Sequence, residues 1–211
     1  MAENQEVDFK VLSSHLRKPE GEMGKVVAGY MNEGNKVITE LTYKSVFKTA
    51  GGNILEIGFG NGFFIPQLIE GGLEKIYGID YSKIMVDEAS KLLEKYIAED
   101  KVELKFGSAD SIPYPDNCFD KVCSINTIYF WDDTEKVISE IKRVLKKNGN
   151  ASIGFRSKER IKDFEFTKYN FNIYSIEEVE EMFYKQGFTL VETTVEDEKI
   201  YDAVCMTVMK G

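Results

Sequence analysis

Short apolar runs alternate along this chain with longer segments whose apolar residues recur every three or four positions. The runs predict strands over residues 53–57, 75–79, 102–106, 119–125 and 150–155. The longer segments predict helices over residues 62–70, 82–96, 133–147 and 175–187. Parallel neighbours need a long crossover, usually a helix, so this order predicts a mostly parallel sheet.

The end of the chain breaks the alternation. Two apolar runs, residues 188–195 and 200–209, are separated by only four residues, Glu196 to Lys199. Four residues are too few for a crossover helix, so these strands are expected to pair antiparallel. The sequence therefore predicts an α/β fold: a Rossmann-like, doubly wound sheet of seven strands, mostly parallel, with a C-terminal antiparallel hairpin.

Two segments have no place in that sheet. Residues 21–47 have a helical pattern that restarts at Asn35, and residues 156–174 are irregular and rich in charged and aromatic side chains. We therefore divide the chain into an N-terminal helical lid, residues 1–48, and a sheet domain, residues 49–211. Ligands of doubly wound sheets bind at the carboxyl ends of the strands, where such segments can form the walls of a site.

The composition narrows the function. The net charge of −9 argues against nucleic acid or an anionic membrane as a partner, because both favour clustered Lys and Arg. No stretch approaches the roughly 18 apolar residues of a membrane span, and the start of the sequence has no apolar signal core, so a cytoplasmic location is expected. Three cysteines without a C-x-x-C pair predict buried free thiols, and a single histidine leaves no ordinary metal site.

The first predicted strand ends in a glycine-rich turn, ILEIGFGNGFF at residues 54–64. The dinucleotide fingerprint G-x-G-x-x-G/A would need a small residue where this chain has Phe63. Glu56 lies inside the strand, two residues before Gly58, where a carboxylate suits a cationic ligand better than a pyrophosphate. Glycines in a tight turn also serve sterics alone, so the turn by itself does not identify the ligand.

Asp80 adds a second acidic position at the end of the second predicted strand, 24 residues after Glu56. An acidic side chain there can accept hydrogen bonds from both hydroxyls of an adenosine ribose. A strand-end aspartate often caps the next helix instead, but Ser82 is available for that cap, which would leave Asp80 free.

Four stretches in this order, ILEIGFGNG, YGIDYS, GSADSIPYPDNCFD and VLKKNGNASI, resemble the motifs of class I S-adenosylmethionine-dependent methyltransferases. The likeness is closest to the small-molecule branch that includes the ubiquinone/menaquinone biosynthesis enzymes, and YSIEEVEEMFYKQGF is also similar to that family. The resemblance implies S-adenosylmethionine as cofactor, S-adenosylhomocysteine as product, and cofactor contacts from Glu56, Gly58, Phe59, Gly60, Asn61, Gly62, Asp80, Tyr81, Met85, Ser108, Ala109, Asp110 and Asn126. Ser108 departs from the family, which usually has Asp there, and Asp110 is expected to replace that contact.

The acceptor side of the site carries weaker signals. Residues 126–131, NTIYFW, follow the fourth strand, so Tyr129 is a catalytic candidate and Trp131 a candidate wall for the substrate. His15 and Tyr30 are candidate bases and Arg156 a candidate substrate contact, although packing or solvation would explain each of them equally well. The NTIY stretch also resembles the N-P-P-Y turn of amino-directed nucleic-acid methyltransferases, but it lacks both prolines.

The leading interpretation is methyl transfer by in-line displacement to a small-molecule acceptor, by a monomer or a homodimer. No strong general base is evident, which suits acceptors that need little deprotonation. A non-catalytic cofactor-binding subunit remains an alternative. An NAD(P)-dependent oxidoreductase is a further one, opposed by Phe63 and by the lack of a Ser/Tyr-x-x-x-Lys pattern.

Overall fold

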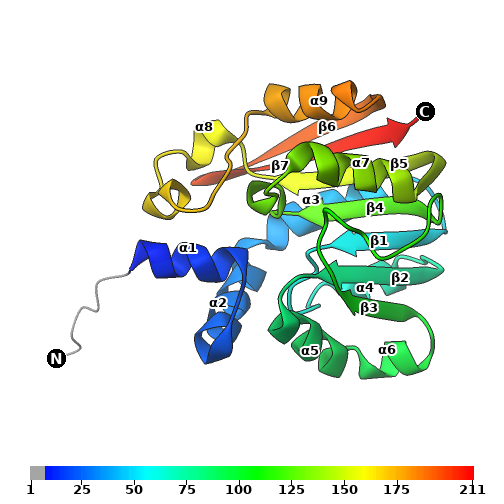
Figure 1. Ribbon diagram of the computed structural model, residues 1–211, viewed down its shortest axis with the longest axis horizontal. Coiled ribbons are helices and arrows are strands. Elements are labelled where there is room, and N and C mark those ends of the chain that lie inside the picture. The colour runs from blue at the N-terminus through cyan, green and yellow to red at the C-terminus, as the bar shows by residue number, and fades with distance from the viewer. Residues whose placement is uncertain (1–7) are drawn as a thin grey trace.

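The computed structural model describes residues 8–211, and this range contains one seven-stranded sheet (Figure 1). Its strands are β1 (Asn53–Ile57), β2 (Lys75–Asp80), β3 (Val102–Phe106), β4 (Phe119–Ile125), β5 (Leu145–Phe155), β6 (Phe188–Glu198) and β7 (Tyr201–Lys210). The order is β3-β2-β1-β4-β5-β7-β6; the pairs up to β5 are parallel, whereas β7 is antiparallel to β5 and β6. The predicted doubly wound sheet with a C-terminal hairpin is confirmed.

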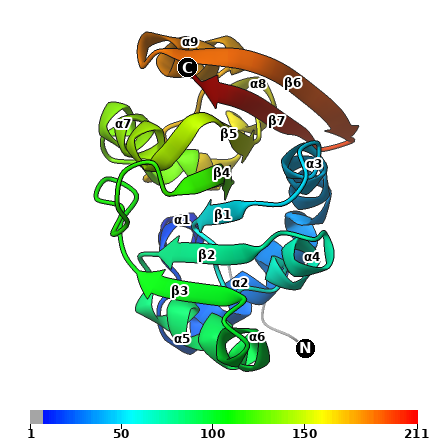
Figure 2. The same ribbon diagram turned by 90° about the vertical axis from the view of Figure 1, so that its right-hand side faces the viewer.

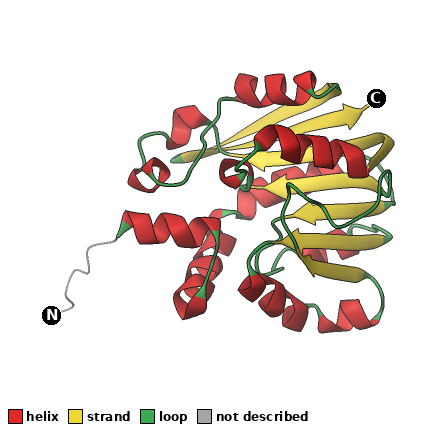
Figure 3. Ribbon diagram, viewed as in Figure 1, coloured by secondary structure: helices red, strands yellow, loops and turns green. Residues whose placement is uncertain are grey.

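Helices cover both faces of the sheet, and Figure 2 shows α7 on one side and α3 and α4 on the other. One face carries α3 (Lys36–Val46), α4 (Ile65–Glu70) and α5 (Lys83–Leu92), and the other carries α7 (Thr134–Val144) and α9 (Ile176–Lys185). The neighbouring β1 residues Ile54 and Leu55 are both fully buried because successive side chains point to opposite, covered faces. Figure 3 draws all helices in red. The shorter ones are α6 (Glu94–Ala98), η1 (Ile128–Phe130), α8 (Lys158–Ile161) and η2 (Glu165–Lys168).

The first two helices, α1 (Phe9–Arg17) and α2 (Gly21–Gly34), lie beyond the carboxyl ends of the parallel strands (Figure 1). Their connection is fastened to the end of β2: the Ser82 hydroxyl donates to the Pro19 carbonyl at 2.7 Å, and the Tyr81 hydroxyl donates to the Arg17 carbonyl at 3.0 Å. Gly24 allows α2 to pass this connection, since a Cβ there would lie 2.7 Å from the Pro19 carbonyl carbon. The predicted helices over residues 21–47, with a restart at Asn35, are confirmed; α1 was not predicted.

Helix α7 ends earlier than predicted. It stops at Val144, and Leu145 is already extended, fully buried and paired with Phe119, so β5 begins five residues before the predicted strand. The predicted helix included Lys146 and Lys147, but both residues lie within β5. Asn148 takes a left-handed conformation there, with φ 62°, and the strand pairing shifts register nearby. The prediction failed because the same residues suit a strand irregularity and a helix end.

Two other helices also differ from prediction. The helix expected from Gly62 begins at Ile65, because the glycine turn holds the chain in left-handed conformations through Gly62. Helix α5, capped by Ser82 as predicted, ends at Leu92, which is 55% exposed although the pattern placed it on the buried face. Leu93 next to it is fully buried and marks the break before α6.

The three cysteines have the state that the sequence predicted. Cys123 and Cys205 are buried, Cys118 is half-buried, and all three are free thiols. Over residues 8–211, no helix has the length and apolar character needed to cross a membrane. Within the same range, no group of three or more His, Cys, Asp or Glu side chains is placed to hold a metal ion.

Candidate functional site

A cavity opens at the carboxyl edge of the sheet, under α1 and α2. Its empty space is about 1250 Å³ with the open mouth included. The wall is formed by the glycine turn after β1, the end of β2, the loop after β3, the loop after β4, and the first two helices. The sequence-predicted residues on this wall are Glu56, Gly58, Phe59, Gly60, Asn61, Asp80, Tyr81, Met85, Ser108, Ala109, Asp110, Asn126 and Trp131.

The glycines of the turn have three different roles. All three have positive φ: 75° at Gly58, 58° at Gly60 and 75° at Gly62. A Cβ on Gly58 would lie 2.4 Å from Thr127 Cγ2, so Gly58 lets the loop after β4 approach. A Cβ on Gly62 would lie 2.9 Å from Ala89 Cβ on α5, and Gly62 is not on the wall. At Gly60 a Cβ would meet nothing within 4 Å, so this backbone faces open space.

Glu56 is a buried carboxylate with no ion pair among the described residues. The Tyr43 hydroxyl lies 3.0 Å from Oε1 and 3.2 Å from Oε2 and donates to this carboxylate. Burial raises the pKa of Glu56 to about 7; the Tyr43 hydrogen bond opposes this rise, and the charge of Asp80 adds to it. A cationic group beside Glu56 would relieve this cost of burial.

Asp80 is the second buried carboxylate of the wall. Its Oδ1 accepts the Ser82 N–H at 2.8 Å and its Oδ2 accepts the Gly60 N–H at 2.9 Å. Burial nevertheless raises its pKa to about 6, against the lowering effect of both N–H groups. Ser82 caps α5 by accepting the Met85 N–H, as predicted, so Asp80 is not the cap of this helix. Asp80 supports both flanking turns while it lines the cavity, and each oxygen can accept another bond.

The loop after β4 holds Asn126 in a strained conformation, with φ 54°. Its N–H donates to the Gly154 carbonyl at 2.8 Å, and its Nδ2 donates to Oδ1 of Asn35 at 2.9 Å. The Tyr129 hydroxyl lies 3.1 Å from Asn126 Oδ1 and donates to it. Tyr129 is 4% exposed and is not on the wall, so the structure places this catalytic candidate behind Asn126, where it orients the amide.

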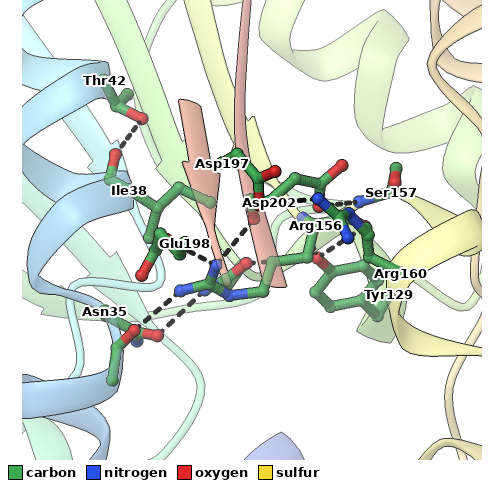
Figure 4. Close-up of polar contacts among 12 residues, drawn as sticks. Asn35, Ile38, Thr42, Tyr129, Arg156, Ser157, Arg160, Asp197, Glu198 and Asp202 are labelled. Atoms are coloured by element: carbon green, nitrogen blue, oxygen red, sulfur yellow. Dashed lines mark hydrogen bonds and ion pairs between the residues drawn. The ribbon is translucent and has the colours of Figure 1, made fainter. Parts of the chain in front are cut away.

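Arg156 is also away from the wall, although it was predicted to contact substrate. It is 6% exposed and spans three parts of the fold (Figure 4). Its Nη1 pairs with Glu198 at 2.7 Å and donates to the Asp202 carbonyl at 2.6 Å, while Nη2 donates to the Gly34 carbonyl at 2.7 Å. Arg156 therefore fastens the C-terminal hairpin to the junction of α2 and α3, next to the wall residue Asn35.

The two candidate bases near the N-terminus do not line the cavity. Tyr30 is 76% exposed on α2, and His15 lies on α1, with a buried Nδ1 that has no hydrogen-bond partner among the described residues. These placements differ from the predicted roles because a single residue's position on a helix does not define the face it presents.

Sequence reasoning missed the wall residues that the lid supplies. They are Leu16 and Arg17 from α1, Pro19 from the connection to α2, Ala28, Met31 and Asn32 from α2, Asn35, and Thr39 from α3. Phe130, which was not among the predicted site residues, also lines the cavity beside Trp131. Arg17 pairs with Asp132 at 2.6 Å, which links α1 to the loop after η1 at the mouth of the cavity. The opposite charges of these two residues are visible in the sequence, but 115 residues separate them, and no local pattern indicates the contact.

These residues fit the cofactor that the motifs imply. Two buried carboxylates without a cationic partner suit an ammonium group and a ribose diol, and the turn at Gly60 offers backbone free of side chain. In a site of this kind, Glu56 and the glycine turn would hold the amino-acid end, and Asp80 the ribose. Tyr81, Met85 and the loop at Ser108 would enclose the adenine.

Comparison with known proteins tests this fit independently. Residues 55–153 match the family described as "Methyltransferase domain". The chain is 34% identical over 145 residues to the uncharacterized methyltransferase YdaC of Bacillus subtilis, covering 68% of this chain and 78% of YdaC. It is 27% identical over 133 residues to 27-O-demethylrifamycin SV methyltransferase of Amycolatopsis mediterranei, covering 60% of this chain and 49% of that enzyme.

A solved structure extends the likeness to the whole fold. A SAM-dependent methyltransferase from Aquifex aeolicus aligns with a TM-score of 0.67 and 24% identity, over 83% of this chain and 98% of that one. At this identity the likeness concerns the fold alone, whereas the extent of the match to YdaC establishes kinship. The chain therefore belongs to the class I S-adenosylmethionine-dependent methyltransferases, and S-adenosylmethionine is its cofactor.

Proposed function

We propose that this methyltransferase acts on a small-molecule acceptor held between α2 and the loop after β4. The observation that carries the proposal is the shape of the site: α1 and α2 cover the carboxyl edge of the sheet and leave a cavity, not an open groove. The Arg17–Asp132 ion pair narrows its mouth. A nucleic acid or protein acceptor would have to insert its reactive group through this mouth to reach the cofactor.

The acidic charge of the chain supports the same proposal. The net charge is −9, whereas binding to a phosphate backbone relies on clustered Lys and Arg. The rifamycin relative is named for a small-molecule acceptor, and the motifs resemble the ubiquinone/menaquinone branch. Because the match covers about half of that relative, its name supports the class of acceptor and not an individual molecule.

Bound S-adenosylmethionine supplies an electrophilic methyl group on a sulfonium, so most of the reactivity comes from the cofactor. The chain's own residues bind, orient and exclude water. Buried Glu56 and Asp80 fix the polar ends of the cofactor, and the ion pair between Arg17 and Asp132 keeps the covering helix in place. Asn126, oriented by Tyr129 and Asn35, presents a fixed amide to the cavity.

One observation favours a second candidate, a cofactor-binding subunit without activity of its own. The described residues on the wall include no histidine, lysine or cysteine, and Tyr129 lies behind it. Of the four carboxylates among the described residues of this wall, Glu56, Asp80 and Asp110 are assigned to the cofactor and Asp132 is paired with Arg17, so an acceptor that must lose a proton would find no unpaired base there. The family assignment excludes the alternative of an NAD(P)-dependent oxidoreductase.

A labelled-methyl assay separates these candidates. The chain is incubated with methyl-labelled S-adenosylmethionine and separate panels of phenols, thiols, small amines, total RNA and a mixed protein substrate. We expect label in small molecules, and loss of that label in the Asp80→Asn variant. Label confined to RNA or protein would contradict the proposal, and tight S-adenosylhomocysteine binding without transfer to any panel would favour the inactive subunit.

A further inference from the structure

The part of the cavity not assigned to the cofactor has an apolar lining. It is formed by Leu16 from α1, Met31 from α2, Phe130 at the end of η1, and Trp131 directly after it. We name these four residues the acceptor wall. None of their side chains ionises, and Trp131 is 5% exposed. Apolar and aromatic surfaces of this kind favour an acceptor that brings apolar area out of water.

The ionic groups around the cavity are strongly unbalanced. Of the described residues that line it, four are carboxylates, Glu56, Asp80, Asp110 and Asp132, and only Arg17 is a cation. Its guanidinium is already bound to Asp132 at 2.6 Å. Glu56, Asp80 and Asp110 are assigned to the cofactor, so an anionic acceptor would meet Asp132 and its paired Arg17. It would lose its hydration there without gaining an unpaired cation in return.

Lys18 does not change this balance. It directly follows Arg17 but pairs with Glu20 at 3.0 Å, outside the lining, and its ammonium lies 5.7 Å from the centre of the Tyr81 ring. A cationic acceptor faces a different obstacle, because a protonated amine is not nucleophilic. No histidine or lysine lines the described cavity to take its proton, and Asp132, the carboxylate on the acceptor side, is paired with Arg17.

Two carboxamides provide the neutral polar contacts. Asn32 and Asn35 line the cavity next to the acceptor wall. Asn35 Oδ1 accepts from Asn126 Nδ2, so the Nδ2 group of Asn35 keeps its donors for another partner. A hydroxyl or carbonyl oxygen on the acceptor suits these amides and needs no charge.

We propose that the methyl acceptor is an uncharged, mainly apolar small molecule carrying a neutral oxygen, packed on the acceptor wall, and that carboxylated or phosphorylated molecules are rejected. This substrate class rests on the proposed function. The proposal predicts that the site prefers a neutral acceptor over a charged molecule whose apolar part is the same.

The test measures binding of three matched probes to the full chain saturated with S-adenosylhomocysteine. The probes are p-cresol, 4-hydroxybenzoate and tyramine, which share a phenol ring and are neutral, anionic and cationic. Trp131 is the chain's one tryptophan, so its fluorescence reports directly on the acceptor wall. Saturation-transfer NMR gives independent dissociation constants without relying on that signal.

We expect p-cresol to bind at least about tenfold more tightly than 4-hydroxybenzoate, a difference of about 1.4 kcal/mol, and more tightly than tyramine. Asp132→Asn frees the guanidinium of Arg17 and should reduce the difference in affinity between p-cresol and 4-hydroxybenzoate. Asp87→Asn, an exposed substitution on α5, is the control: it removes the same charge outside the cavity and should leave this difference in affinity unchanged.

Equal or tighter binding of 4-hydroxybenzoate or tyramine would overturn the inference, as would failure of all three probes to bind. These results are distinct from failure of the proposed function, which would appear as absence of labelled methyl transfer to any small molecule. The probes require only the product-bound chain, so their order of affinity remains measurable in either case.

Discussion

Glu56→Gln is expected to stabilise the free protein at alkaline pH while weakening its hold on the cofactor. In the free chain, the buried Glu56 carboxylate has no cationic partner among the described residues, and burial raises its pKa from 4.5 to about 7. Glutamine preserves the size and an acceptor oxygen for Tyr43 without the charge. The substitution therefore removes a cost of folding that the wild-type site carries for its ligand.

The pKa gives the magnitude and the pH range. Below pH 4.5 the carboxyl is protonated in both the folded and the unfolded chain, and its contribution to stability is fully present. Between pH 4.5 and about 7 the unfolded chain ionises first, so stability falls as the pH rises and then levels off. At about 1.4 kcal/mol per pH unit, the loss is on the order of 3 kcal/mol.

Urea denaturation followed by circular dichroism, repeated across this pH range, measures the effect. The free energies of unfolding of wild type and Glu56→Gln should converge in acid, and the variant should be more stable by about 3 kcal/mol at pH 8. Glu40→Gln, an exposed substitution on α3, removes an equal charge and serves as the control. Parallel pH profiles for wild type and Glu56→Gln would refute the reasoning.

Three other substitutions test separate parts of the site. Asp80→Asn should weaken S-adenosylhomocysteine binding by roughly 1.5–3 kcal/mol, measured by calorimetry, and unchanged affinity would restrict Asp80 to supporting its turns. Gly58→Ala places a Cβ 2.4 Å from Thr127 Cγ2, so its melting temperature should fall well below that of Gly60→Ala, which adds a Cβ in open space at a similar φ. Equal melting temperatures would contradict that packing. Arg156→Met should cost about 3–5 kcal/mol of unfolding free energy by leaving buried partners unpaired; a loss below about 1 kcal/mol would show that the ion pair is dispensable.

The sheet was predictable because each of its signals is local. Strand β1 is an apolar run ended by a glycine turn, Ser82 caps the next helix, and the four residues from Glu196 to Lys199 leave room only for a hairpin. The cofactor side of the cavity was predictable for the same reason, since Glu56 and Asp80 end neighbouring strands, whose pairing brings them together.

The acceptor side depends on contacts between distant parts of the chain. Arg17 meets Asp132, and Asn35 meets Asn126, across separations that no sequence period describes. Tyr129 was assigned to chemistry by its place in the chain, yet its side chain is buried behind the wall. The end of α7 was predicted too late because Lys146 to Gly149 also suit the end of a helix. The tertiary pairing of Leu145 with Phe119 overrides this local signal and places these residues in β5.

The central claim is that two buried, partly protonated carboxylates form the binding site for the cationic and hydroxyl groups of the cofactor. Calorimetric titration with S-adenosylhomocysteine at about pH 6.5, in buffers of different ionisation enthalpy, tests it most directly. With pKa values of about 7 for Glu56 and about 6 for Asp80, binding should release about one proton per chain. The heat should then vary with the buffer, and the release should shrink in Glu56→Gln. Absence of binding, or binding with no proton release, would contradict the assignment of this site.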